Sequence, residues 1–161
     1  MHKEYESNTY IHTYIPTYLP TYTMLQPIRC LPSLLHHLSG PRVTDPFSLI
    51  NRYQGTDWSS QSSDYPVSLF RNEYMELMLW NWTKGKCDVY YNNYSTVHTK
   101  ILKGSFHAAE TSMRGNNPIL PKKNITLLYG QSYTFHPFSK VILAAQEPST
   151  TLQMYYYQNM C

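Results

Sequence analysis

Residues 9–23 repeat a four-residue unit that reads Thr-Tyr-Ile-His, Thr-Tyr-Ile-Pro, Thr-Tyr-Leu-Pro and Thr-Tyr-Thr. The unit places a tyrosine at every fourth position, as one face of a helix would. Pro16 and Pro20 exclude a continuous helix, because proline lacks the backbone donor and its ring clashes with the preceding turn. Under the standard genetic code, the codons ACA-TAC-ATA-CAT would encode the first unit, and these codons are one tetranucleotide in tandem. The repeat therefore has the form of a translated microsatellite, which needs no selection on protein structure.

Prolines are concentrated in the same part of the chain. Six of the 11 prolines lie between positions 16 and 46, and each one biases the preceding residue toward extended geometry. We predict that residues 1–46 form a disordered Pro/Tyr-rich extension, with at most a helical turn or two over Ser33 to Leu38. Residues 47–64 are predicted to be a polar linker.

The material for a hydrophobic core is limited. Leu, Ile, Val and Phe together supply 34 of 161 residues, close to the level of about one fifth below which disorder is the usual outcome. Ala and Glu, both strong helix formers, number only 4 and 6. The sequence predicts a marginal core, and its composition is typical of an orphan, young or spurious reading frame with low complexity.

Residues 65–161 are the part of the chain for which the sequence predicts a fold, a small α+β domain. Asp64 and Pro66 have the character of a helix start, and the apolar residues between Val67 and Trp82 recur at helical spacing. We therefore expect one amphipathic helix over 67–82, ended near Gly85. Several short antiparallel strands are expected to follow it.

Two hairpins are predicted among these strands. In the first, Val89 to Tyr91 and Tyr94 to Leu102 flank an Asn-Asn turn. In the second, Asn124 to Tyr129 and Ser132 to Phe135 flank Gly130-Gln131. Val141 to Ala145 and Thr151 to Tyr157 are two further strand candidates, and the second of these is uncharged and free of proline. We expect the 151–157 segment to promote self-association when it is exposed.

No motif for catalysis, a cofactor or a metal is present. The sequence lacks a G-x-S-x-G elbow, a phosphate-binding G-x-x-x-x-G-K-[ST] and an H-E-x-x-H pair. Cys87, His98 and His107 are too far apart in sequence to define a metal site by spacing. We expect no enzyme activity, no cofactor, no metal and no catalytic residue.

The charge balance and the hydropathy argue against a nucleic-acid-binding, a membrane-spanning or a secreted protein. A net charge of +3, spread along the chain, offers no basic stripe for nucleic acid. No segment approaches the roughly 20 apolar residues needed to span a bilayer, and the first thirty residues lack the pattern of a signal peptide. We therefore expect no nucleic-acid partner, no transmembrane segment and a cytoplasmic location by default.

Clustered aromatic residues support an alternative function. Aromatic side chains are enriched at recognition surfaces because they bury a large area and lose few rotamers. The alternative is a small β-rich binding module for a carbohydrate or a membrane surface, with exposed aromatics as the binding residues: Trp80, Trp82, Tyr90, Tyr91 and Tyr94.

Overall fold

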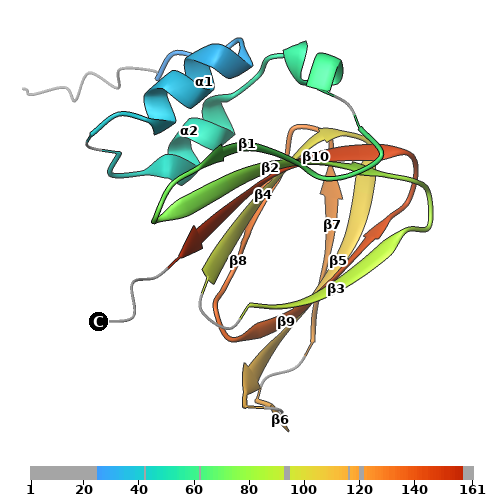
Figure 1. Cartoon of the computed structure of the whole chain (residues 1–161). Helices are drawn as coiled ribbons and strands as arrows, with labels where there is room; N and C mark the ends of the chain where they lie inside the picture. Colours follow the sequence, from blue (N-terminus) through green and yellow to red (C-terminus); the bar gives the residue numbers. More distant parts are fainter. Residues whose placement is uncertain are drawn as a thin grey trace, which may run out of the picture.

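The computed structural model describes residues 25–41, 43–61, 63–92, 95–115, 117–119 and 122–157. The repeat over 9–23 lies outside these ranges. Within them the chain forms two β-sheets, with two short helices packed against one of the sheets (Figure 1). In chain order the elements are α1 (Leu31–Leu38), α2 (Pro46–Arg52), the 3-10 helix η1 (Asp57–Gln61), β1 (Val67–Arg71), β2 (Met75–Trp82), β3 (Cys87–Asn92), β4 (Ser95–Lys103), β5 (Ser105–Arg114), β6 (Asn117–Pro118), β7 (Lys123–Leu128), β8 (Ser132–Phe135), β9 (Ser139–Ala145) and β10 (Ser149–Tyr157).

The two sheets form an antiparallel β-sandwich. The first, here called the helix-side sheet, has the strand order β1-β2-β10-β4-β8. The second, here called the outer sheet, has the order β3-β9-β5-β6, and β7 also pairs with β5. Every strand pair is antiparallel. The fold is therefore mostly β-sheet, and the prediction of an α+β domain with one amphipathic helix is wrong.

The segment expected to be that helix forms β1 and β2 instead. The turn between the two strands is fixed by Asn72, whose Oδ1 accepts hydrogen bonds from the backbone N–H groups of Tyr74 and Met75 at 2.8 and 2.9 Å. Because β2 is covered on both faces, apolar residues occupy both of its sides and the usual polar alternation is lost. One side, toward the helices, carries Met75, Leu77 and Leu79, and the other, toward the outer sheet, carries Trp80 and Trp82.

Both helices lie in ranges where disorder or a linker was expected. Their prolines begin the helices and do not break them, because Pro32 and Pro46 occupy first-turn positions that need no backbone donor. Asp45 caps α2 by accepting the Ser48 N–H at 3.0 Å. For the described residues from 25 to 46 the expectation of disorder is wrong, since several of their side chains are fully or almost fully buried: Ile28, Leu31, Leu34 and Leu38. Ile50 and Tyr53, in the range expected to be a polar linker, are completely buried as well.

Two hydrophobic clusters replace the marginal core that the composition predicts. The first lies between the helices and the helix-side sheet, and includes Leu34, Ile50 and Leu152. The second lies between the two sheets, and includes Trp82, Phe106 and Phe135. Leu152 and Thr151 are both completely buried on β10, on opposite faces of the strand. A few aliphatic residues thus serve two cores, because one sheet contributes both of its faces.

The predicted strands are present, but the predicted hairpins are not. β3 pairs with β9, and β4 pairs with β10 and β8, so the chain changes sheet between Asn92 and Ser95. β7 and β8 likewise belong to different sheets, although Gly130 makes the turn between them with a φ of 79°. β10 is paired along both edges, by β2 and β4. The segment expected to promote self-association is therefore enclosed within a sheet.

One glycine is required where β4 turns into β5. Gly104 has a φ of 77°, and a Cβ atom at this position would lie 2.1 Å from the Ser149 Oγ. Both the backbone conformation and the close approach of β10 exclude a side chain here.

None of the helices that the structure describes is long and apolar enough to cross a membrane.

Candidate functional site

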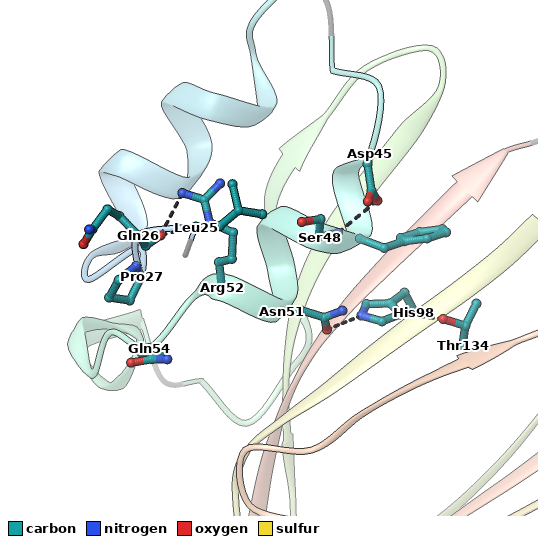
Figure 2. Close-up of a pocket in the computed structure, with 11 residues that line it drawn as sticks. Leu25, Gln26, Pro27, Asp45, Ser48, Asn51, Arg52, Gln54, His98 and Thr134 are labelled. Carbon is teal, nitrogen blue, oxygen red and sulfur yellow. Dashed lines mark hydrogen bonds between the residues drawn. The ribbon is translucent and has the colours of Figure 1, made fainter. Parts of the chain in front are cut away.

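A cavity of about 660 Å³ lies where α2 meets β4 and β8 (Figure 2). We call it the His98 cavity. Its walls come from three parts of the chain: the segment before α1, the helix α2 with its flanking residues, and the helix-side sheet. The lining residues are Leu25, Gln26, Pro27, Asp45, Phe47, Ser48, Asn51, Arg52, Gln54, His98 and Thr134.

Local geometry explains why these side chains converge. Ser48, Asn51 and Arg52 are three and four residues apart, so they share one face of α2. On the sheet, His98 lies directly opposite Thr134 in the register of β4 and β8. Paired residues on neighbouring antiparallel strands point to the same side of the sheet. The helix and the sheet therefore present their polar side chains to the same space.

His98 connects these two walls. It is 4% exposed, and its Nδ1 lies 2.7 Å from the Thr134 Oγ1 while its Nε2 lies 2.8 Å from the Asn51 Oδ1. The Asn51 carbonyl oxygen accepts, so we assign the proton of the neutral ring to Nε2, and Nδ1 then accepts from the Thr134 hydroxyl. Burial lowers the pKa of His98 to about 4, with a smaller opposing influence from Asp45. The ring is therefore neutral near pH 7.

Aromatic packing holds the imidazole in place. The Phe47 ring stacks on His98 with the ring centroids 5.0 Å apart and an interplanar angle of 23°. Tyr156 from β10 meets the Phe47 ring edge-on at 6.1 Å. Phe47 thus forms an apolar wall beside the polar groups of the cavity, a combination that is typical of small-molecule sites.

Arg52 and Asp45 have structural partners at opposite ends of α2. Arg52 donates from Nε and Nη2 to the Gln26 main-chain oxygen at 2.9 and 2.7 Å, which ties the segment before α1 to α2. Asp45 caps the start of the helix through Oδ1. No hydrogen bond to another described residue is found for the hydroxyl of Ser48, the amide nitrogen of Asn51 or the side chain of Gln54. Asn51 and Gln54 are exposed to solvent, and Ser48 is partly exposed.

The order Thr134, His98, Asn51 resembles the hydroxyl–imidazole–amide order of some hydrolases. Two observations argue against catalysis by this set. An imidazole with a pKa of about 4 is a weak base at neutral pH, and both of its ring nitrogens already hold elements of the fold together. Docking of α2 on the sheet accounts for the arrangement without a reaction.

The described residues do not form a metal site. No three His, Cys, Asp or Glu side chains among them lie close enough together to hold an ion. Cys87 and His107 lie on the outer sheet, where each is paired with Ala144 of β9, from β3 and β5 respectively. His98 lies on the helix-side sheet and packs against α2, so the three residues considered as ligands do not converge.

Two of the aromatic residues proposed for surface binding lie in the core between the sheets. Trp82 is 3% exposed, and its ring stacks on Trp80 at 5.5 Å within the core between the sheets. Tyr90 and Tyr91 lie on β3 in the opposite sheet, and Tyr94 is outside the described residues. The alternative of a module that binds carbohydrate or membrane through these exposed aromatics is therefore not supported. The residues around His98 were not predicted, because they are 36 and 47 positions away from it in sequence.

Comparison with solved structures identifies the architecture. A protein of Thermus thermophilus matches with a TM-score of 0.54 and 12% identity, covering 65% of this chain and 97% of that one. A cupin superfamily protein of Desulfitobacterium hafniense matches with a TM-score of 0.50 and 13% identity, covering 77% and 98%. The Cnp3 cupin domain of Schizosaccharomyces pombe matches with a TM-score of 0.49 and 10% identity, and the chain spans 64% of its length.

These likenesses concern the fold alone. Neither the comparison with protein-family models nor that with curated proteins finds a match. An architecture shared with natural proteins overturns the interpretation of the chain as an orphan or spurious reading frame, low in complexity and largely disordered. The described part of this chain has a cupin-like β-sandwich fold.

Proposed function

We propose that this protein is a non-catalytic domain that binds a small, neutral, amide-bearing molecule in the His98 cavity. The observation that supports the proposal most strongly is the cavity itself, whose volume of about 660 Å³ lies within the usual range for small-molecule sites. Its lining combines apolar walls at Phe47 and Pro27 with a few convergent polar groups. The proposed site is a hollow beside α2 that is open to solvent, and it uses none of the clustered aromatics of the two sheets.

The polar groups favour an amide as ligand. Asn51 and Gln54 each carry a carboxamide, which donates and accepts hydrogen bonds, and Ser48 adds a hydroxyl that does both. A primary amide or a lactam has the same pairing of donor and acceptor. Two such groups side by side form complementary hydrogen bonds, whereas a ligand with acceptors alone leaves the side-chain acceptors unpaired.

The charges of the lining favour a neutral ligand. Asp45 and Arg52 are the charged side chains of the cavity, and their formal charges cancel. His98 adds no charge, because burial keeps it neutral near pH 7. Transfer of a charged ligand into this cavity would therefore carry a desolvation cost without a net opposite charge to offset it.

A nuclear magnetic resonance titration tests the proposal. The full chain, labelled with ¹⁵N, is titrated with a set of neutral primary amides and lactams. We expect amide shifts confined to Ser48, Asn51 and Thr134 and their neighbours. Ser48→Leu fills the cavity and should weaken binding by at least about tenfold, while Ser33→Leu on α1, which does not line the cavity, should leave it unchanged.

Two results would contradict the proposal. The first is an absence of localised shifts at millimolar concentrations of every amide tested. The second is hydrolysis of p-nitrophenyl acetate or of a bound amide by the wild-type chain that is lost in His98→Gln, because that result would identify an enzyme.

A further inference from the structure

A second cavity, of about 380 Å³, lies on the other side of the C-terminal end of α2. We call it the Lys100 cavity. Asn51 and Gln54 border both cavities, and Lys100 lies two residues after His98 on the same face of β4. This second cavity is lined by different chemistry, with a single cationic side chain and three aromatic residues, Tyr53, Trp58 and Tyr129.

Lys100 brings a positive charge into this buried region. Its side chain is 5% exposed, and its Nζ donates to the main-chain oxygens of Asn51 and Tyr53 at 2.7 and 2.5 Å. An ammonium group has three donors, so one N–H remains after these two bonds. The two carbonyl oxygens satisfy donors but carry no formal charge.

No carboxylate is among the residues that line the cavity. Burial lowers the pKa of Lys100, and the two groups bonded to its Nζ are neutral carbonyl oxygens. A buried cation without a counter-ion is costly, and an anion that enters the cavity removes this cost and accepts the remaining donor. The electrostatics of the cavity therefore favour a negatively charged ligand.

The walls indicate the rest of the ligand. Trp58 is half-buried and packs against the core under the helices, while Tyr129 is 73% exposed at the turn after β7. Leu102 adds an aliphatic side chain, and Gly130 leaves its part of the wall open because nothing lies within 4 Å of its Cβ position. Aromatic and aliphatic walls of this kind pack on a flat ring.

We propose that the Lys100 cavity binds a small aromatic carboxylate. The carboxylate accepts a hydrogen bond from Lys100 Nζ, and the ring packs against Trp58 and Tyr129. This site is separate from the one proposed over His98, and it takes an anion where the other takes a neutral molecule.

Benzoate and benzamide test the proposal directly, since the two molecules have nearly the same shape and differ in charge. In ¹⁵N titrations of the full chain, benzoate should shift the backbone amides of Tyr129 and Gly130. Benzamide should bind there at least about tenfold more weakly, because the charge-assisted hydrogen bond is lost. Shifts at Ser48 and Thr134 report on the His98 cavity, so the two proposals fail independently.

Variants identify the residues responsible. Lys100→Met should weaken benzoate binding by at least about tenfold, and Lys103→Met, an exposed lysine on the same strand, should leave it unchanged. Tyr129→Ala should weaken it about fivefold, with the exposed Tyr65→Ala as its control. Because Tyr129 is exposed, its variant remains informative if Lys100→Met fails to fold.

Three results would overturn the inference: no shift at Gly130 in benzoate up to tens of millimolar, equal affinity for benzoate and benzamide, or equal loss of binding in Lys103→Met and Lys100→Met.

Discussion

The ring of His98 on β4 is hydrogen-bonded through Nε2 to the Asn51 Oδ1 on α2, over 2.8 Å. This contact joins the sheet to the helix that covers it, and the pair is separated by 47 residues in sequence. Two residues further along β4, Lys100 is bonded to the main chain at the end of the same helix. Two basic side chains on one strand thus hold α2 in place, and the cavities proposed as binding sites lie beside them.

The first prediction concerns the pH dependence of stability. The pKa of His98 is lowered to about 4 in the folded chain, against 6.5 for an unperturbed histidine. Between these two pH values the unfolded chain therefore binds more protons than the folded chain. The contribution of His98 to the free energy of unfolding is complete above about pH 6.5, and it is lost as the pH falls toward 4. The difference amounts to about 3 kcal/mol.

Urea unfolding at pH values from 4 to 7 measures this effect. His98→Gln should flatten the dependence, because glutamine does not titrate. His107→Gln removes an exposed histidine and should preserve the wild-type slope. An unchanged slope in His98→Gln would show that His98 does not titrate as the structure implies.

The second prediction concerns the hydrogen bonds by which Lys100 caps the C-terminal end of α2. Lys100→Met leaves the main-chain oxygens of Asn51 and Tyr53 buried without this donor, and the relief of the buried charge offsets part of the loss. We expect a decrease of about 2 kcal/mol in the free energy of unfolding. Chemical denaturation of Lys100→Met and of Lys103→Met makes the comparison, and equal stabilities would refute a capping role.

The third prediction concerns Trp82. Its Nε1 donates to the Thr151 Oγ1 at 3.0 Å, and Phe106 meets the ring edge-on at 5.3 Å. Trp82→Ala should lower the free energy of unfolding by about 4 kcal/mol, as expected for a large buried aromatic. The readout is the midpoint of thermal unfolding by circular dichroism. A variant that keeps the wild-type midpoint would indicate an exposed tryptophan.

The fourth prediction concerns a buried hydroxyl. Thr99 is completely buried, and its Oγ1 has no hydrogen-bond partner among the described residues. Thr99→Val removes this polar atom at nearly constant shape and should raise the free energy of unfolding by about 1 kcal/mol. Thr151→Val is the matched control and should be destabilising, because Thr151 accepts the bond from Trp82. Destabilisation by Thr99→Val would instead point to a bound water at Oγ1.

The positions of the later strands could be read from the sequence. Segments rich in β-branched and aromatic residues, such as Thr151 to Tyr157, form strands, and Gly130 makes the turn where it was expected. These features depend on a few neighbouring residues. The pairing of the strands depends on the whole chain, because most connections from β2 onward cross from one sheet to the other. A two-residue Asn-Asn turn gives no sign of such a crossing.

Dependence on distant contacts also explains why the predictions for the first half of the chain were wrong and why the site around His98 was not predicted. A strand buried on both faces, as β2 is, loses the period of two, so its apolar residues matched a helix by spacing. Pro32 and Pro46 belong to the prolines that predict extended backbone, yet they begin helices, and only the sheet beneath these helices supplies the apolar contacts that stabilise them. Local sequence thus determined strand propensity and turn chemistry. Tertiary structure decided the pairing, the burial of the helices and the meeting of His98 with Asn51 and Thr134, because each of these depends on contacts between residues that are distant along the chain.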